Sequence, residues 1–425
     1  MTMPDIQHGA RRAQISWCVF DWANSAFPTV IVTFVFAAYF TSGVAASPEE
    51  GTSLWGYALS ASGVAIALLS PVLGAIADRK AQRKPWIAVF AAICMICAAS
   101  LWFVRPDPDW VIVALVLFAV ANVAFEVGTV FYNALLPGLV PAERIGRLSG
   151  WGWGLGYAGG LCALAVALAL FVQPDPSPFG LDRGTAEHVR AVGPLVAVWF
   201  ALFSVPLFLF VPEGIERSGL SAMGAARDGL ADLWNTLRTL HRHKALARFL
   251  IARLLYIDGL NTLFAFGGIY AAGTFGMTLD DIILFGIAMN VTAGLGAVAF
   301  AWIDDYLGSK ETVLIALVAI TALGLPLLLI SSVTWFWVLA LSLGLFMGPA
   351  QAASRSLMAR LAPPDKLGEM FGLFALSGKI TAFLGPAVLA AVTAAFASQR
   401  AGMATVLVFI CAGAAILMTV RVRKT

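Results

Sequence analysis

The chain contains twelve separate stretches that are long and apolar enough to cross a lipid bilayer, and this feature limits its fold more than any other. A membrane-spanning helix needs about 20 mostly apolar residues, and only helices or closed barrels satisfy their backbone hydrogen bonds within hydrocarbon. We expect the spans at residues 16–42, 53–77, 86–104, 109–134, 148–172, 193–212, 247–274, 280–303, 312–330, 334–358, 368–393 and 400–420. The sequence therefore predicts an all-α, multi-pass membrane protein.

The composition agrees with this prediction. Hydrophobic residues make up 60% of the chain and charged residues only 12%, whereas a soluble domain carries about 25% charged residues. The first apolar run is too long for the core of a signal peptide, so we expect it to be retained as a helix. The chain has no cluster of metal-ligand residues at the usual spacing and no nucleotide-binding loop. We therefore expect no metal site, no cofactor, no enzyme chemistry and no nucleic-acid partner.

Lysine and arginine residues concentrate in the loops on one side of the predicted membrane, if the spans alternate in direction. The opposite side has only these basic residues: Arg105, Arg183, Arg190 and Arg400. Loops rich in lysine and arginine remain in the cytoplasm. The sequence thus predicts that both termini and the 213–246 connection are cytoplasmic.

The polar connection between the sixth and seventh spans divides the chain into two halves. The predicted organisation is a cytoplasmic N-terminus (1–15), a six-helix bundle (16–212), a cytoplasmic linker (213–246), a second six-helix bundle (247–420) and a cytoplasmic tail (421–425). Within the linker, apolar residues recur at helical spacing at Leu230, Leu233, Trp234 and Leu237. This pattern predicts a helix that lies on the membrane surface.

The two halves share sequence landmarks in the same order, as expected of a transporter built from repeats. The first landmark reads Asp-x-x-Asn-Ser/Thr-x-Phe and begins at Asp21 and again at Asp258. Asp21 and Asn24 share one helix face, as do Asp258 and Asn261, because each pair is three residues apart. Two interpretations remain open. Each carboxylate could face a cavity and carry a proton, or it could cap a helix or pair with a cation such as Arg253.

The second landmark is a charged loop after the second span of each half. The spacing from Asp78 to Lys84 is repeated from Asp304 to Lys310. The third landmark is a Leu-x-Pro-x-x-x-x-Gly-x-x-x-Gly pattern, at Leu139, Pro141, Gly146 and Gly150 and again at Leu361, Pro363, Gly368 and Gly372. Because three landmarks keep one order, the halves are predicted to be structural repeats.

The first charged loop resembles the signature of the major facilitator superfamily. The matching residues are Gly74, Asp78, Arg79, Arg83 and Lys84. The chain further resembles the vacuole-effluxer-like branch, which groups fungal autophagy-related vacuolar amino-acid effluxers with bacterial permeases. That resemblance rests on the blocks DWANSAF (21–27), FYNALLP (131–137), GLFALSGK (372–379) and FLGP (383–386). It implies two pseudo-symmetric six-helix bundles that work by alternating access.

The resemblance also implies a gating role for the charged loop. Asp78 can approach the N-terminus of a facing helix, where a carboxylate is favoured by about 0.3–1 kcal/mol. With Arg79 and Arg83, this contact would hold the cytoplasmic side shut while the binding site faces outward. The second copy at Asp304 lacks the arginine pair and has Phe300 where the signature has glycine.

The major facilitator resemblance places spans one, four, seven and ten around a central cavity. Glu126 lies in the middle of span four, with Asn133 two turns later. An acidic residue at this depth is a candidate for proton coupling or for binding a substrate amine. The alternative is a glutamate that stays protonated and hydrogen-bonded to a neighbouring helix.

Two basic residues in the second half complete the set of candidates. Lys379 in span eleven needs an acidic partner to keep its charge when buried, so Asp21, Asp258 or Glu126 should lie near it in at least one state. Arg355, with Gln351 one turn before it, could bind a substrate carboxylate through two parallel hydrogen bonds. Arg355 could equally be an ordinary positive residue at the cytoplasmic end of its span.

We expect a secondary active transporter that is proton-linked, acts as a monomer and lies in the bacterial inner membrane. By resemblance, its substrate is an amino acid or a short peptide, and export is the favoured direction. The alternatives are transport of another amphipathic solute, such as a siderophore, drug or sugar derivative, and a membrane receptor or scaffold that moves no solute.

Overall fold

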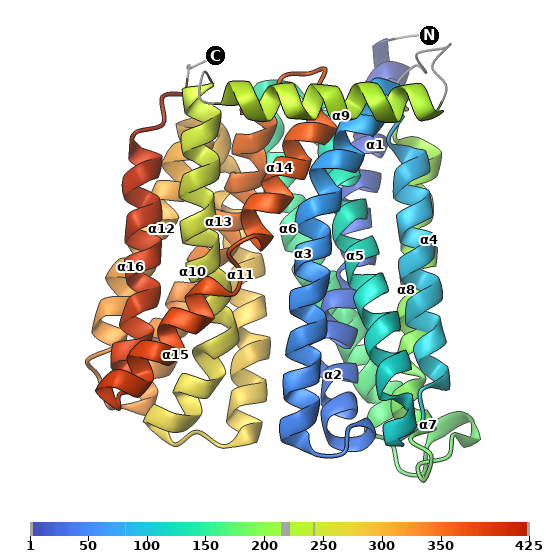
Figure 1. Cartoon of the computed structure of the whole chain (residues 1–425), viewed down its shortest axis with the longest axis vertical. Coiled ribbons are helices and arrows are strands. Elements are labelled where there is room, and N and C mark those ends of the chain that lie inside the picture. Colours follow the sequence, from blue (N-terminus) through green and yellow to red (C-terminus); the bar gives the residue numbers. More distant parts are fainter. Residues whose placement is uncertain (1–2, 81, 214–221, 241–242, 423–425) are drawn as a thin grey trace. The chain divides into compact units, whose positions relative to one another are not determined.

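The computed structural model describes residues 3–80, 82–213, 222–240 and 243–422, and the regular elements in these ranges are helices (Figure 1). The first half contains α1 Met3–Asn24, α2 Phe36–Tyr39, α3 Pro48–Lys80, α4 Lys84–Ser100, α5 Val111–Leu135, α6 Ile145–Ala167, α7 Glu187–Arg190 and α8 Val192–Phe210. The linker contains α9 Ala222–Thr239. The second half contains α10 Lys244–Phe275, α11 Leu279–Leu307, α12 Ser309–Leu327, α13 Val333–Leu361, α14 Leu367–Lys379, α15 Leu384–Phe396 and α16 Gln399–Met418. Parts of the predicted N-terminus (1–2), linker (214–221, 241–242) and tail (423–425) lie outside the described residues.

Shorter helical turns connect or extend these helices. The π-helical turns are Phe27–Phe34, Phe40–Val44 and Leu168–Val172, and the 3₁₀ turns are Leu101–Phe103, Pro108–Trp110, Leu136–Gly138, Ala142–Arg144 and Pro178–Gly180. In the described ranges, 12 helical segments are long and apolar enough to span a membrane. Large apolar side chains such as Val64, Leu68 and Val318 are exposed on them, as expected where lipid would replace water. The predicted all-α, multi-pass class is confirmed.

The first span is less regular than the predicted run of 16–42. α1 ends at Asn24, and the chain continues in the π-helical turn Phe27–Phe34. Pro28 has no N–H, so it cannot donate the bond that a continuous α-helix requires. The hydroxyl of Thr33 donates to the carbonyl of Pro28 (2.9 Å) inside this widened turn.

The eleventh span is broken, although its hydropathy predicts one helix over 368–393. α14 ends at Lys379 and α15 begins at Leu384, and Figure 1 draws them as two separate segments. Pro386 lies in the first turn of α15, where the backbone N–H groups have no intrahelical partner and a proline costs no helix bond. The sequence does signal a kink through Pro386, but it does not show that the helix stops for four residues.

The chain packs into two compact units that do not coincide with its two halves. The first unit contains Met1–Ile66, Ala81–Tyr132 and Leu155–Glu216, and the second contains Ala67–Lys80, Asn133–Gly154 and Arg217–Thr425. The second unit therefore joins the second-half helices to two first-half segments, the end of α3 and the connection from α5 to α6. The division into two six-helix bundles, 16–212 and 247–420, therefore stays a prediction.

The core of the first unit is built on aromatic contacts between α1 and α5. The rings of Trp17 and Tyr132 stack with centroids 4.6 Å apart. Trp17 Nε1 donates to the carbonyl of Tyr132 (3.2 Å), and the Tyr132 hydroxyl donates to the carbonyl of Trp17 (2.9 Å). Both buried aromatic polar groups thus have partners, which fixes the register of α1 against α5.

Glycines allow helices from different halves to pack closely within the second unit. A Cβ atom at Gly74 of α3 would overlap the carbonyl oxygen of Gly368 in α14, and one at Gly372 would overlap the backbone of Pro71. On α6, a Cβ at Gly150 would stand 2.6 Å from the carbonyl oxygen of Ala297 in α11. Backbones approach this closely only where small residues replace larger side chains.

Candidate functional site

The carboxylate of Asp78 at the end of α3 binds the first turn of α14. Its Oδ1 accepts a hydrogen bond from the N–H of Gly368 (2.9 Å), and its Oδ2 accepts one from the N–H of Glu369 (2.8 Å). The first N–H groups of a helix have no intrahelical partner, and the helix dipole favours a negative charge beside them. One buried carboxylate therefore ties a first-half segment to a second-half helix. We call this contact the Asp78 latch.

The linker helix α9 packs over the Asp78 latch. Arg79, which follows the latch carboxylate, forms an ion pair with Asp232 of α9. Lys366, just before α14, donates to the hydroxyl of Thr236 (3.0 Å) on the next turn of α9. Figure 1 shows α9 at a steep angle to α10 and α14. The linker helix therefore contacts both partners of the latch.

The rest of the charged loop belongs to the first unit. The backbone N–H groups of Arg83 and Lys84 both donate to the carboxylate of Glu213, at 2.8 and 3.1 Å. Glu213 thereby caps the N-terminus of α4, where two donors would otherwise lack partners. The signature residues thus have two roles. Asp78 binds the first turn of α14, whereas Arg83 and Lys84 form the start of α4. Sequence reasoning missed Glu213 because it lies far along the chain.

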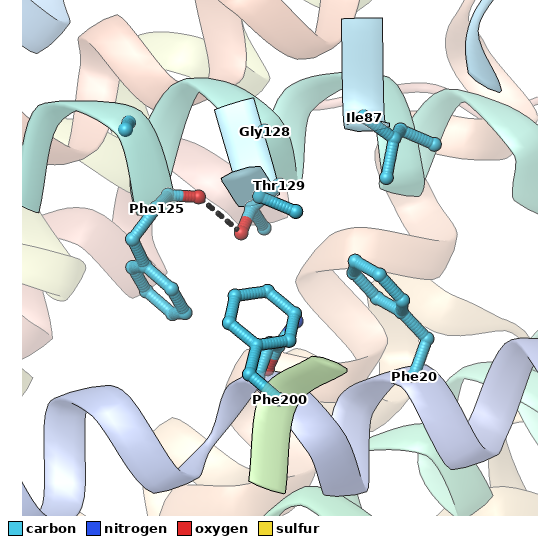
Figure 2. A pocket seen from close by; sticks show the side chains of 9 residues that line it. Phe20, Ile87, Phe125, Gly128, Thr129 and Phe200 are labelled. Carbon is cyan, nitrogen blue, oxygen red and sulfur yellow. Dashed lines mark hydrogen bonds between the residues drawn. The ribbon is translucent and has the colours of Figure 1, made fainter. Parts of the chain in front are cut away.

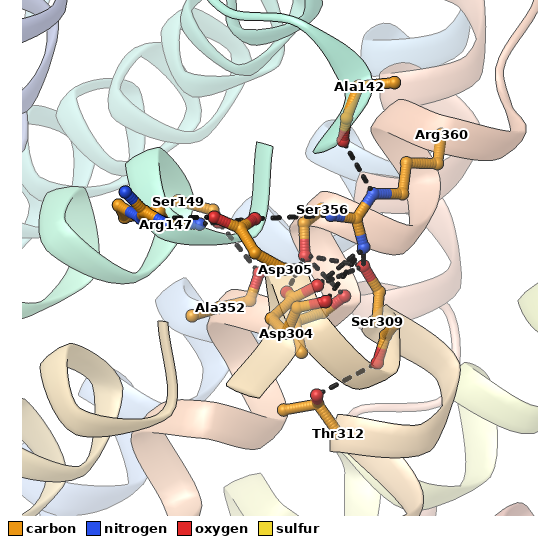
Figure 3. Close-up of polar contacts among 12 residues, drawn as sticks. Ala142, Arg147, Ser149, Asp304, Asp305, Ser309, Thr312, Ala352, Ser356 and Arg360 are labelled. Atoms are coloured by element: carbon orange, nitrogen blue, oxygen red, sulfur yellow. Dashed lines mark hydrogen bonds and ion pairs between the residues drawn. The ribbon is translucent and has the colours of Figure 1, made fainter. Parts of the chain in front are cut away.

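The second charged loop forms a polar cluster of its own. Asp304 accepts hydrogen bonds from the hydroxyls of Ser309 (2.7 Å) and Ser356 and from Nη1 of Arg360 (2.6 Å). These residues come from the end of α11, the start of α12 and the end of α13, and Figure 3 shows them converging on the carboxylate. Together with Asp305 they form what we call the Asp304 cluster.

Asp305 links this cluster to the first half of the chain. Its carboxylate accepts from the N–H of Arg147 (3.1 Å) in the first turn of α6, and the Arg147 side chain lies 3.3 Å away. Nη2 of Arg360 lies 3.5 Å from the same carboxylate. A Cβ at Gly146 would stand 2.6 Å from Cβ of Asp304. The second loop thus holds the start of α6, as the first loop holds the start of α14.

The residue that makes this helix contact differs from the predicted one. The repeat spacing matches Asp304 to Asp78, yet the carboxylate that binds the helix N–H group is that of Asp305. The missing arginine pair is replaced by Arg360, which comes from α13 instead of the loop. In the sequence, the adjacent acidic pair could have indicated that Asp305 makes this contact. No local pattern in the sequence points to Arg360.

Arg355 is buried against residues of the first half. Its Nε donates to the Ser149 hydroxyl (2.9 Å), its Nη2 to the Ser149 carbonyl (2.7 Å) and its Nη1 to Oδ1 of Asn133 (3.3 Å). The guanidinium carbon also lies 5.6 Å from the centroid of the Trp153 ring. The structure therefore brings together two predicted site residues, Arg355 and Asn133. Gln351, one turn earlier, is partly exposed.

Asp258 and Arg253 of α10 hold the two ends of the break in span eleven. Asp258 Oδ2 accepts from the N–H of Gly385 (2.8 Å) at the start of α15. Arg253 donates to the carbonyl of Phe374 and to the hydroxyl of Ser377 (2.8 Å) near the end of α14. An anion thus lies at a helix N-terminus and a cation near a helix C-terminus, as helix dipoles favour.

The remaining second-half candidates lie close to this break. Lys379 is the last residue of α14 and is partly exposed. Asn261 is exposed, whereas Asp258, three residues earlier, is 1% exposed. The predicted carboxylate–amide pair therefore does not share one environment in the second half.

The remaining substrate and proton candidates of the first half lie in the first unit. Asp21 and Asn24 are both buried on α1, and Glu126 is partly exposed on α5. Asn24 lines a small pocket with mainly apolar neighbours, and Figure 2 shows Phe20, Phe125 and Phe200 around it. The pocket has room for about one water molecule. It is too small for a metabolite.

The fold and the paired helix contacts define a class of protein. The xylose–proton symporter XylE superposes with a TM-score of 0.74 at 13% identity, covering 98% of this chain and 96% of that chain. A bacterial homologue of the iron transporter ferroportin gives a TM-score of 0.69 at 15% identity, covering 96% of this chain and 98% of that chain. At such identities the likeness concerns the fold alone, and the fold is that of the major facilitator superfamily.

Sequence comparison gives the family within that class. Residues 43–425 match the family described as "Vacuole effluxer Atg22 like", and the chain belongs to it. The MFS-type transporter YxiO of Bacillus subtilis is 26% identical over 399 residues, which is 93% of this chain and 90% of YxiO. Autophagy-related protein 22 of Cryptococcus neoformans is 27% identical over 300 residues, 65% of this chain and 51% of that protein. The chain thus spans about half the length of that fungal relative, and the resemblance predicted from the sequence motifs is confirmed.

Proposed function

We propose that this protein is a secondary active transporter that works by alternating access. The observation that carries the proposal is the pair of contacts in the second unit, the Asp78 latch and the Asp304 cluster. Each binds a carboxylate of one half to the first turn of a helix of the other half. In a transporter built from inverted or parallel repeats, such contacts close one entrance to the site.

The contacts are of a kind that can break and re-form during a transport cycle. The Asp78 latch and the Asp304 cluster each consist of a few hydrogen bonds to a charged group, and such bonds contribute about 1.5–3 kcal/mol each. The glycine contacts around them add close packing without interlocking side chains. The basic residues around the two contacts support a cytoplasmic position for this closed end, because loops rich in lysine and arginine remain in the cytoplasm. This assignment, with both termini cytoplasmic, is part of the proposal.

Arg355 is our candidate for substrate recognition. Its partners Ser149 and Asn133 both come from the first half, so separating the halves at this end would break these hydrogen bonds of the guanidinium. A released arginine can bind a carboxylate through two parallel bonds. This supports an amino acid or a short peptide as substrate, and the family description as an effluxer supports export.

Proton linkage is the remaining part of the proposal. Acidic side chains in spanning helices usually serve ion or proton movement, and the candidates here are Asp21, Glu126 and Asp258. Lys379 adds a basic group that can exchange partners with them. We place the protein in the inner membrane of a bacterium, working as a monomer.

The test is transport by the purified protein in liposomes with an imposed pH gradient. The panel should contain amino acids, dipeptides, sugars, a siderophore and a cationic drug. We expect accumulation of an amino acid or dipeptide that depends on the proton gradient. Absence of any solute flux and any proton flux would contradict the proposal. Flux of a sugar, siderophore or drug alone would keep the transporter but replace its substrate.

A further inference from the structure

The break in span eleven leaves backbone groups without helical partners inside a membrane span. Pro386 has no N–H, so the carbonyl of Ala382, four residues earlier, cannot form its usual helix bond. Non-helical backbone at membrane depth persists where it is buried in protein or lines a polar site. In several transporter folds, such interrupted helices mark ion and substrate sites.

Two buried oxygens beside this break have no hydrogen-bond partner within the described part of the chain. They are Oδ1 of Asp258 and Oγ1 of Thr262, one turn apart on α10, and each residue is 1% exposed. A threonine hydroxyl in a helix normally bonds to the carbonyl four residues earlier, as Thr321 does with Leu317 (2.9 Å). The Thr262 hydroxyl is therefore turned away from its own helix.

Both oxygens lie around the same point next to Gly385. A Cβ atom at Gly385 would overlap Oγ1 of Thr262 and would stand 3.2 Å from Oδ1 of Asp258. Only glycine lets the Thr262 hydroxyl approach the backbone of α15 this closely. The other carboxylate oxygen, Oδ2, is already used by the Gly385 N–H. One small atom or ion next to Gly385 could contact both free oxygens.

We infer that a small monovalent cation, Na⁺, binds between Asp258 Oδ1 and Thr262 Oγ1 at the break in span eleven. Hard cations bind carboxylate and hydroxyl oxygens, and α10 supplies one of each beside the break. A proton on Asp258 would satisfy one oxygen only, because no direct hydrogen bond joins the two. Na⁺ bound to both would satisfy each of them and would balance the buried carboxylate.

Two cationic residues, Arg253 and Lys379, flank the break. Arg253 is the nearest cation on α10, and it is bound at the opposite end of the break, to Phe374 and Ser377. Lys379 is the last residue of α14, directly before the break. The inference rests on the proposed transport function, in which Na⁺ at this site would act as a coupling ion beside any proton site.

The test measures Na⁺ binding directly on the full-length protein in lipid nanodiscs. Radioactive ²²Na⁺ binding and the thermal midpoint are measured at constant ionic strength, with choline replacing Na⁺. We expect saturable ²²Na⁺ binding and a midpoint that rises with Na⁺ and does not rise with choline. Thr262→Val should weaken Na⁺ binding at least tenfold. Thr262→Ser should bind within about threefold of the unchanged protein, because it keeps the hydroxyl.

A matched control removes a hydroxyl that already has a partner. Thr321→Val should leave Na⁺ binding unchanged, because the Thr321 hydroxyl is bonded within α12. Asp258→Asn should abolish binding if it folds, and the two Thr262 variants decide the question if it does not. Equal Na⁺ binding by Thr262→Val and the unchanged protein would overturn the inference. So would a midpoint that responds to pH and not to Na⁺, which indicates a proton or a bridging water.

The result can be separated from the test of transport. Proton-driven solute flux without any Na⁺ binding would overturn this inference and leave the proposed function intact. Na⁺ binding lost in Thr262→Val, together with no solute flux, would support the site and contradict the transport proposal.

Discussion

At the scale of single residues, the charge of Asp78 should be what holds its latch. Asp78→Asn keeps the size of the side chain and loses the charge that the α14 dipole favours, which is worth up to about 2 kcal/mol when partly buried. We expect the closed end to open more often, by a factor of about 5–30. The measurement is the rate at which a water-soluble maleimide modifies Ser70→Cys, a fully buried position in α3.

The control for this experiment is an acidic residue in the exposed first turn of the same helix. Glu49→Gln, made in the same background without native cysteines, should leave the labelling rate unchanged. A labelling rate in Asp78→Asn equal to that of the control would contradict a role for the charge.

Arg360 should matter because it lies between two carboxylates. Removing it by Arg360→Gln leaves Asp304 and Asp305 close together, and breaking a buried ion pair typically costs about 3–5 kcal/mol. We expect a lower thermal midpoint and partial recovery in the double variant Arg360→Gln/Asp305→Asn, which removes one of the two charges. No recovery in the double variant would show that the loss comes from packing and not from charge.

Asp182 in the loop between α6 and α7 gives a pH-dependent prediction. The N–H of Gly184 (2.8 Å) and the hydroxyl of Thr185 (2.9 Å) donate to its carboxylate and hold its pKa below the usual range. A lowered folded-state pKa stabilises the loop at pH above the unfolded value near 4, and this stabilisation is lost as pH falls through the folded value. At pH 7, Asp182→Asn should reduce amide-exchange protection at Gly184 several-fold. Well below the folded pKa, the unchanged protein and the variant should show the same protection.

At the scale of helices, the glycine at the α3–α14 crossing should be required for closure. A Cβ added by Gly74→Ala would overlap the carbonyl oxygen of Gly368, so α3 and α14 would have to separate. On the same helix, Gly56 has open space where a Cβ would stand. Gly56→Ala should therefore be neutral or stabilise by up to about 1 kcal/mol through helix propensity. Equal maleimide labelling of Ser70→Cys in both alanine variants would contradict close packing as the reason for Gly74.

The helices themselves could largely be predicted from the sequence, because each span is an apolar run of sufficient length. The position of Asp78 could be predicted for a similar reason, since its signature is short and continuous. The break at Lys379–Leu384 could not, because hydropathy stays high across it and its two helix ends are held by tertiary contacts, among them those of Asp258 and Arg253. The pairing of Arg360 with Asp304 also escaped prediction, since nothing local relates α13 to the end of α11.

At the scale of the whole molecule, the two charged loops make the same kind of helix contact but with different residues. Both charged loops hold the first turn of a helix from the other half. One uses a carboxylate covered by α9, and the other uses two carboxylates around Arg360. The Arg79–Asp232 pair is about one-third exposed, so salt should weaken it more than the buried Asp304 cluster. The α3–α14 side is therefore the one we expect to respond first to ionic strength.

Alternating access itself predicts that tying the halves together must stop transport. A Cβ at Gly154 of α6 would stand 3.6 Å from Cβ of Val298 in α11, a separation that suits a disulfide. Oxidising Gly154→Cys/Val298→Cys, in a background without native cysteines, should abolish solute flux, and a reductant should restore it. Each single variant should be insensitive to oxidation.

A disulfide within one half tests whether the effect comes from the link between halves. Gly402→Cys/Thr393→Cys joins α16 to α15, where a Cβ at Gly402 would stand 3.2 Å from Cβ of Thr393. Oxidation of this pair should leave flux unchanged, because both helices belong to the second half. Full transport by the oxidised α6–α11 pair would mean that these helices do not separate during transport. The movement that opens and closes the protein would then lie elsewhere than at the Asp304 cluster.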